Sequence, residues 1–287
     1  MKIAITGGKG GTGKSTIATA LAYALSNKKK VLLVDADVDC PNDHLILKME
    51  RKKIKTVTQM IPKWNFDRCI KCGRCSEVCK ANAIVFVQGK NPIFVPEQCS
   101  GCGACIIACP TKAISESSKE IGTLFSGKYD KLNFLGGELR PGEIASEFVV
   151  SALMDYVKEE SKEKNYDFII VDTAAGTHCD VISALGGADL TIAVTEPTPL
   201  GAHDLGLILE LTKILNIPTK IILNRSGIGN NTLIQNIAKK YGVDIITELP
   251  YDKHIIEAYS KGEPVKSKYI DDLIEKIYET KPETVKK

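Results

Sequence analysis

The stretch Gly8-Lys9-Gly10-Gly11-Thr12-Gly13-Lys14-Ser15 decides the fold of this chain. It follows the short apolar run 3–6, and a helical pattern of apolar residues begins directly after it. Glycines between a strand and a helix let backbone N–H groups converge on phosphate oxygens, and the helix N-terminus adds a partial positive charge. The pattern G-x-x-x-x-G-K-[ST] in this context therefore predicts a phosphate-binding loop that holds a nucleotide.

The residue types of this loop predict their roles. Lys14 supplies a positive charge to the β- and γ-phosphates, and the Ser15 hydroxyl is a ligand for Mg²⁺. A glycine-rich turn that is merely capped by Ser15 is the alternative interpretation, and the complete motif in its context disfavours it. From this loop we expect ATP to be bound by Gly8, Lys9, Gly10, Gly11, Thr12, Gly13, Lys14, Ser15 and Thr16.

Strand and helix patterns alternate through the rest of the chain, apart from its middle. Continuous apolar runs typical of buried parallel strands occur at 31–34, 168–171, 190–194 and 220–223. Helical patterns cover 149–164, 205–215, 231–241 and 270–279. This alternation predicts an α/β fold with a mostly parallel sheet flanked by helices. The glycine-rich residues 118–145 are expected to return irregularly into that sheet.

A cysteine repeat interrupts the alternation between residues 62 and 115. Eight of the ten cysteines lie in two copies of C-x₂-C-x₂-C-x₃-C, thirty residues apart. This is the bacterial ferredoxin pattern, in which the fourth cysteine of each copy binds the other copy's cluster. We therefore expect two [4Fe–4S] clusters. Cluster one is assigned to Cys69, Cys72, Cys75 and Cys109, and cluster two to Cys79, Cys99, Cys102 and Cys105.

The repeat predicts a small α+β domain, ferredoxin-like, inserted at 62–115 into a discontinuous host domain of 1–61 and 116–287. Lys80 stands where a ferredoxin usually has a proline after the fourth cysteine, which places a positive charge beside one cluster. Zinc bound by two Cys₄ sets is the alternative. The x₃ spacing and the duplication favour iron–sulfur clusters.

The loop sequence with Lys9 resembles the deviant Walker A motif of the MinD/Mrp/ParA ATPases. The segment from Asp35 and Asp37 to Asn42 is similar to the switch I of that family, and Asp172 to Thr177 is similar to its switch II. The 195–198 segment and Asp204 match a further recurrent loop. The resemblance also implies adenine contacts from Asn224, Arg225, Pro250, Tyr251 and Asp252.

The resemblance implies an ATP-dependent homodimer, or a heterodimer with a related chain, that encloses two ATP molecules. Lys9 would reach the partner's phosphates, Asp37 would position the attacking water or a Mg²⁺-bound water, and Asp172 would hold Mg²⁺ through water. The implied catalytic residues are Lys9, Lys14 and Asp37, and the implied Mg²⁺ residues are Ser15, Asp37 and Asp172. A turn-capping Asp37 and a solvated Lys9 are the alternatives. Because no water-positioning glutamine is identifiable, we expect slow hydrolysis without a partner.

Composition excludes several classes of protein. The 38 basic and 35 acidic residues nearly balance at a net charge of +3, which does not favour a nucleic-acid binder. No apolar run of about 18 residues and no secretory leader pattern is present, so we expect a cytoplasmic protein without stable membrane insertion. The basic runs 28–30 and 51–55 are expected to be solvated, and the 270–279 helix to pack on the sheet.

The leading hypothesis is an ATPase whose nucleotide state is coupled to the two clusters in electron transfer, with a redox or iron–sulfur client protein. One alternative is an ATPase that assembles or carries iron–sulfur or metal cofactors. Another is a positioning or scaffold protein of the MinD/ParA kind with structural clusters. Cys179 follows the switch II segment, and an interface metal shared with Cys40 stays open beside the interpretation of a small buried thiol.

Overall fold

The computed structural model describes residues 1–279, so the end of the predicted host domain at 280–287 lies outside the described residues. Within them, nine strands form one sheet in the order β11-β10-β9-β1-β8-β2-β7-β6-β3. The strands are β1 (Lys2–Thr6), β2 (Val31–Ala36), β3 (Arg51–Trp64), β6 (Ile114–Tyr129), β7 (Leu132–Leu139), β8 (Phe168–Thr173), β9 (Leu190–Thr195), β10 (Thr219–Ser226) and β11 (Ile245–Pro250). The strands from β11 to β7 pair in parallel. The predicted α/β fold with a mostly parallel sheet is confirmed.

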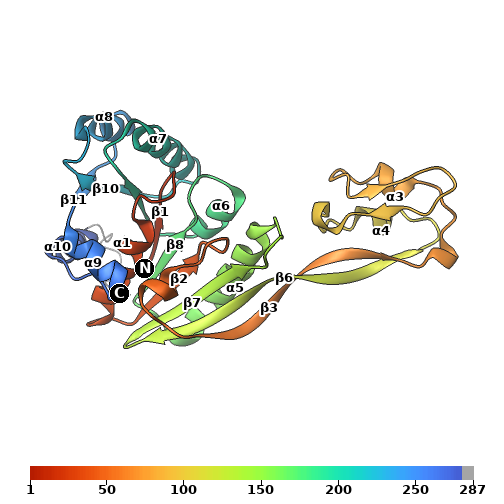
Figure 1. Cartoon of the computed structure of the whole chain (residues 1–287), viewed down its shortest axis with the longest axis horizontal. Coiled ribbons are helices and arrows are strands. Elements are labelled where there is room, and N and C mark those ends of the chain that lie inside the picture. Colours follow the sequence, from red (N-terminus) through yellow and green to blue (C-terminus); the bar gives the residue numbers. More distant parts are fainter. Residues whose placement is uncertain (280–287) are drawn as a thin grey trace, which may run out of the picture.

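Helices cover both faces of the parallel part of the sheet (Figure 1). One face packs against α1 (Lys14–Ser26) and α10 (Lys268–Glu279), through a core that includes Ile3, Ile5 and Leu273. The opposite face packs against α5 (Ser146–Lys164), α6 (Cys179–Leu185), α7 (Pro199–Ile214) and α8 (Asn231–Tyr241). Burial on both faces explains why these strands are continuous apolar runs rather than alternating ones. The short helices α2 (Asp43–Ile46) and α9 (Lys253–Lys261) lie near the carboxyl ends of β2 and β11.

The antiparallel pair β3 and β6 extends beyond the sheet and carries residues 65–113 at its end (Figure 1). We call this pair the arm and residues 65–113 the cysteine segment. The expectation of an irregular return at 118–145 is wrong over most of that range. Residues up to 129 belong to β6, and β7 pairs in parallel with β2 and antiparallel with β6.

The glycines of β7 mark close packing instead of a loop. A Cβ on Gly136 would lie 2.8 Å from the Phe134 ring, and one on Gly137 would lie 2.7 Å from Val38 Cγ1. Glycine within a strand permits such close approach. The glycine content that suggested irregular structure therefore reflects close packing against the Phe134 ring within β7 and against the loop after β2.

The cysteine segment repeats its backbone as well as its sequence. The helix α3 (Arg74–Glu77) matches α4 (Ala104–Ile107), and the 3-10 turn Phe66–Arg68 matches Pro96–Gln98. Left-handed backbone recurs at the same offset of thirty residues, in the pairs Lys71 and Gly101, Gly73 and Gly103, and Asn82 and Lys112. The segment also contains the short strands β4 (Ile84–Val85) and β5 (Ile93–Phe94), which pair with each other. The two halves thus fold as copies of one unit.

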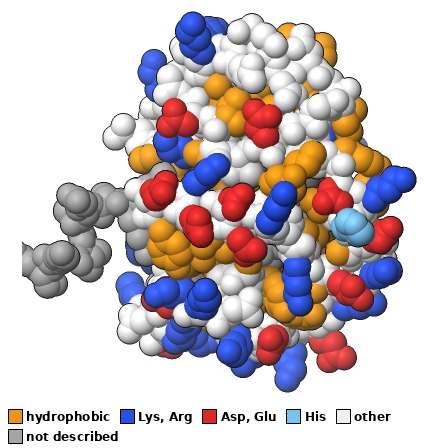
Figure 2. All heavy atoms as spheres, turned by 90° about the vertical axis from the view of Figure 1, so that its left-hand side faces the viewer, with side chains coloured by type: hydrophobic (Ala, Val, Ile, Leu, Met, Phe, Trp, Pro, Cys, Tyr) orange, Lys and Arg blue, Asp and Glu red, His pale blue; other side chains and the backbone are white. Residues whose placement is uncertain are grey.

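Two further predictions concern the surface of the chain. No helix within residues 1–279 is long and apolar enough to cross a membrane. The predicted packing of the last helix is confirmed, because Ile270, Leu273 and Ile277 of α10 are buried. At the end of the molecule opposite the arm, basic and acidic side chains are interspersed with apolar patches (Figure 2). This face does not present a surface of one charge.

Candidate functional site

The glycine-rich loop connects β1 to α1 at the carboxyl edge of the parallel sheet. Gly11 and Gly13 have φ values of 80° and 96°, in the left-handed region that favours glycine. A Cβ on Gly13 would lie 2.4 Å from the Asn224 side-chain nitrogen. That nitrogen donates to the Thr12 carbonyl at 2.7 Å, so Asn224 clamps the loop from β10. Beside Gly11 there is open space within 4 Å, which leaves its backbone accessible to a ligand.

The loop borders a cavity of about 930 Å³, a size suited to a nucleotide. Its far wall is apolar and is built from α1, α9 and α10, with Ile17, Ile255 and Ile270 among its residues. The predicted site residues on its lining are Gly10, Gly11, Gly13, Lys14, Ser15, Thr16, Asp37, Asn224, Arg225, Pro250, Tyr251 and Asp252. The structure thus brings together residues from four separate segments of the chain.

Four predicted residues do not line this cavity: Gly8, Lys9, Thr12 and Asp172. Gly8 has a packing role, because a Cβ there would lie 2.3 Å from the Asp204 Cβ. Lys14 is only 7% exposed, and its ammonium group donates to the Lys9 carbonyl at 3.3 Å. Burial lowers the pKa of Lys14, while the charges of Asp172 and Asp37 oppose that effect.

Three buried carboxylates lie behind the loop. Oxygen atoms of Asp35, Asp43 and Asp172 lie within 4.8 Å of one another. Asp35 accepts hydrogen bonds from the backbone N–H groups of Asp37, Asn42 and Asp43 at 3.0 to 3.2 Å. By contrast, neither carboxylate oxygen of Asp43 or Asp172 has a hydrogen-bond partner among residues 1–279.

The pKa values of the carboxyl groups in and beside this cluster are raised. Burial raises the pKa of Asp172 to about 7, although the Lys14 charge opposes the shift. Burial and the neighbouring Asp35 raise the pKa of Asp43 well above its usual value. Burial also raises the pKa of Asp37, against a hydrogen bond from the Cys40 N–H group. Unpartnered buried carboxylate oxygens beside a phosphate loop suit Mg²⁺ and its bound water molecules.

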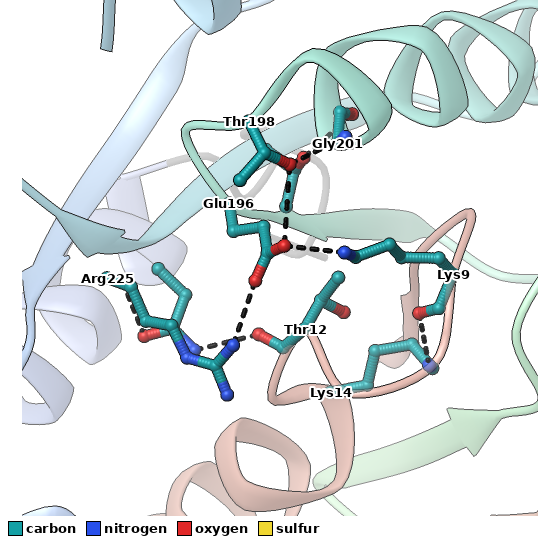
Figure 3. A network of polar contacts seen from close by, with 9 residues as sticks. Lys9, Thr12, Lys14, Glu196, Thr198, Gly201 and Arg225 are labelled. Carbon is teal, nitrogen blue, oxygen red and sulfur yellow. Dashed lines mark hydrogen bonds and ion pairs between the residues drawn. The ribbon is translucent and has the colours of Figure 1, made fainter. Parts of the chain in front are cut away.

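Glu196 forms ion pairs with two predicted site residues, Lys9 and Arg225 (Figure 3). Its carboxylate accepts from Lys9 Nζ at 2.6 Å and from the Arg225 guanidinium at 2.8 Å. Burial favours the neutral form of Glu196, but Lys9 and Arg225 outweigh it and lower the pKa. Lys9 therefore points at Glu196, on the loop after β9, and not into the cavity. In the sequence, Glu196 stands out only as part of the loop 195–198, and no motif indicates Asp43.

The cysteine segment contains a second, small cavity. Its lining includes Cys69, Cys72, Cys75 and Cys109, together with the Trp64 ring at the end of the arm. Backbone N–H groups donate to sulfur in both halves of the repeat, from Ala83 to Cys79 and from Ala113 to Cys109, each at 3.2 Å. Such N–H···S contacts stabilise thiolates that bind a cluster.

Cys99, which is assigned to cluster two, lies closer to the base of the arm. The Cys99 carbonyl accepts from the buried Gln59 side chain at 2.8 Å. Burial raises the pKa of Cys105 to about 11, and the nearby Cys99 and Cys102 contribute to this shift. Cys40 borders the nucleotide-sized cavity, and Cys179 begins α6; both are exposed.

Comparisons with known proteins identify relatives of this chain. The family model of the CobQ/CobB/MinD/ParA nucleotide binding domain matches residues 3–265. A protein of Methanocaldococcus jannaschii, the uncharacterized protein MJ0579, is 38% identical over 264 residues, covering 92% of this chain and 90% of that protein. The iron-sulfur cluster carrier protein of Aquifex aeolicus is 24% identical over 96% of this chain and 64% of its own length.

Among solved structures, the septum site-determining protein MinD of Pyrococcus horikoshii, complexed with Mg-ADP, has a TM-score of 0.61 at 21% identity. The match covers 96% of this chain and 95% of that chain. At this identity the likeness shows the fold.

Proposed function

The chain belongs to the CobQ/CobB/MinD/ParA nucleotide-binding domain family, and on this basis we propose that it is an ATPase that couples nucleotide state to two [4Fe–4S] clusters in electron transfer. The observation that carries this proposal is the position of the two sites on one sheet. The nucleotide-sized cavity lies at the carboxyl end of β1 and β2, and the cysteine segment is carried by β3 and β6 of that same sheet.

For ATP, the residues that line the cavity supply the expected contacts. Backbone N–H groups of the loop, the N-terminus of α1 and the Lys14 charge would hold the phosphates. Ser15 and Asp37 would bind Mg²⁺ or its water molecules, and Asp172 would accept from those waters with its unpartnered oxygens. Bound Mg²⁺ would stabilise charge on the transferring phosphoryl group. The apolar wall beside Tyr251 would hold the adenine base.

We propose further that ATP drives dimerisation and that Lys9 acts on the phosphates of the partner subunit. In the single chain the Lys9 ammonium group is bound to Glu196. It would have to leave this carboxylate before it could contact phosphate. The ion pair thus supports a model in which hydrolysis is slow until the dimer forms.

For the clusters, the arrangement of sulfur atoms supports iron–sulfur binding over zinc. Tetrahedral zinc with Zn–S distances of about 2.3 Å would place its sulfur atoms about 3.8 Å apart. Within residues 1–279 no three cysteine sulfurs lie within 4.8 Å of one another. Sulfur atoms farther apart than zinc needs, with N–H···S contacts in both halves of the repeat, suit cubane clusters, which would supply one-electron chemistry.

Cluster assembly or carriage is the second candidate function. The match to the iron-sulfur cluster carrier protein favours it, as does the exposed Cys40 on the border of the nucleotide-sized cavity. We favour electron transfer because six of the eight repeat cysteines are at least partly buried, whereas donor scaffolds need accessible thiolates.

The deciding experiment is an EPR-monitored redox titration of anaerobically purified protein with and without MgATP. A nucleotide-dependent shift of tens of millivolts supports coupling, since 59 mV is a tenfold change in the equilibrium constant of a one-electron couple. The variant Lys14→Ala should lose the nucleotide response and keep its iron content. Unchanged potentials in a protein that still dimerises with ATP would refute thermodynamic coupling and favour the carrier function.

A further inference from the structure

The two halves of the cysteine segment differ in where they lie along the arm. The loop of Cys99 packs on β3 at Gln59 and Met60, since a Cβ on Gly101 would lie 3.1 Å from the Met60 carbonyl oxygen. The cavity lined by Cys69, Cys72, Cys75 and Cys109 instead includes Trp64, the last residue of β3. Five residues of strand separate Gln59 from Trp64, which is about 16 Å. Cluster two would therefore lie nearer the nucleotide-binding body, and cluster one nearer the far end of the arm.

The two halves of the cysteine segment also differ in charge, and the first half is the more basic. Residues 65–83 carry four basic and two acidic side chains, whereas residues 95–113 carry one of each. Arg68, Lys71 and Arg74 around the first loop correspond to Gln98, Gly101 and Ala104 around the second. The second loop has the same cysteine spacing but lacks these charges. The charges are therefore not part of the pattern that would bind a cluster.

We call residues 68–75, nearer the far end of the arm, the outer loop, and residues 98–105 the inner loop. The three basic side chains of the outer loop are available to a partner. Arg68, Lys71 and Arg74 are exposed, and none of them forms an ion pair with any residue in the described range 1–279. Lys71 and Arg74 border the cavity of cluster one, beside the exposed Cys72. The neighbouring Ile70 is 64% exposed and adds an apolar contact. Positive charge around a small apolar contact is complementary to an acidic protein surface.

We propose that this outer loop is the docking face for an acidic one-electron carrier protein, which exchanges electrons with cluster one. One electron passes between the carrier and the cluster, so that one partner is oxidised as the other is reduced and no covalent bond forms. This inference rests on the proposed function, because it requires a cluster at Cys69, Cys72, Cys75 and Cys109. The inner loop packs on the arm and would relay the electron toward the body.

The test compares two carriers of opposite charge. Full-length, cluster-loaded protein is reduced and mixed in a stopped-flow instrument with an acidic flavodoxin or with a basic cytochrome c. The variant Lys71→Gly/Arg74→Ala installs the residues that the second half of the repeat already has, so folding and cluster binding are retained. The control Lys28→Glu/Lys29→Glu changes exposed charges on the body, away from the arm.

We expect the double variant to reduce flavodoxin at least tenfold more slowly at low salt, with little change at high salt. Its reaction with cytochrome c should be unchanged or faster, and the control should resemble the wild type. Carbodiimide cross-linking should join the Lys71 amine to flavodoxin carboxylates. Equal flavodoxin rates for the double variant and the wild type would overturn the docking face. A protein without iron and sulfide would instead overturn the proposed function, and this inference with it.

Discussion

Removing the charge of Glu196 should strengthen ATP-dependent dimerisation. The Lys9 ion pair is 2.6 Å long, with side-chain exposures of 27% for Lys9 and 9% for Glu196. Two charges about 4 Å apart attract by roughly 4 kcal/mol at an effective dielectric constant of about 20. Desolvation, side-chain ordering and screening reduce the net value of such a pair to about 1 kcal/mol.

Each subunit of a symmetric dimer would break one such pair, which amounts to about 2 kcal/mol per dimer. The substitution Glu196→Gln preserves size and removes the charge. We therefore expect the variant to dimerise roughly 30-fold more tightly than the wild type. Sedimentation velocity with Mg²⁺ and a non-hydrolysable ATP analogue measures the dimer dissociation constant without interference from turnover.

Two controls separate release of Lys9 from a general loss of charge. The variant Glu143→Gln removes a comparable ion pair, Lys119–Glu143 at 2.6 Å, and should leave dimerisation unchanged. In a Lys9→Ala background, Glu196→Gln should bring no further gain, because the residue to be released is gone. If Glu196→Gln dimerises as weakly as the wild type, or more weakly, then Glu196 does not restrain Lys9 and the reasoning fails.

Two other predictions follow from the buried carboxylates and the cysteine repeat. In nucleotide-free protein, the raised pKa of Asp43 means that the folded state keeps a proton which the unfolded chain releases near the ordinary pKa of 3.8. The free energy of unfolding should then fall as pH rises above about 4, so Asp43→Asn should gain stability relative to the wild type with rising pH in urea unfolding. An equal difference at all pH values would contradict this. The variant Cys109→Ser should lower iron from about eight to about four atoms per chain, whereas Cys179→Ser should keep the full content; equal iron in both would refute Cys109 as a cluster ligand.

Local sequence signals predicted the parallel part of the fold well. The apolar runs of β2, β8 and β9 and the loop before α1 needed no distant partner to be recognised, since burial on both faces leaves a continuous pattern. The strands β6 and β7 were missed because glycine content normally indicates loops. Here Gly136 is explained by the Phe134 ring of its own strand, and Gly137 by Val38 of the loop after β2.

The same limit applied to the site. Spacing within the loop identified Lys14 and Ser15, and both line the cavity. Glu196 lies 187 positions after Lys9, and no local pattern indicates that the two form an ion pair. Asp43 follows Asn42 in a segment already rich in acids, so its complete burial between Asp35 and Asp172 was visible only after folding.

The sheet offers a physical route from the proposed nucleotide site to the proposed cluster sites. Strand β2 leads directly to Asp37, and the Val38 carbonyl accepts a hydrogen bond from the Leu139 N–H group of β7 at 2.8 Å. Strand β7 pairs with β6 over residues 122–129, and β6 continues as one strand into the arm. At the base of the arm, Lys119 bonds both Glu143 of the body and the Pro96 carbonyl beside the inner cysteine loop. A backbone rearrangement at Asp37 and Val38 must therefore either break the hydrogen bond from Leu139 or move β7, together with the paired strand β6. Because β6 is one continuous strand, movement of β7 would also displace the cysteine segment, and under the proposed function clusters held there would respond to nucleotide through the backbone.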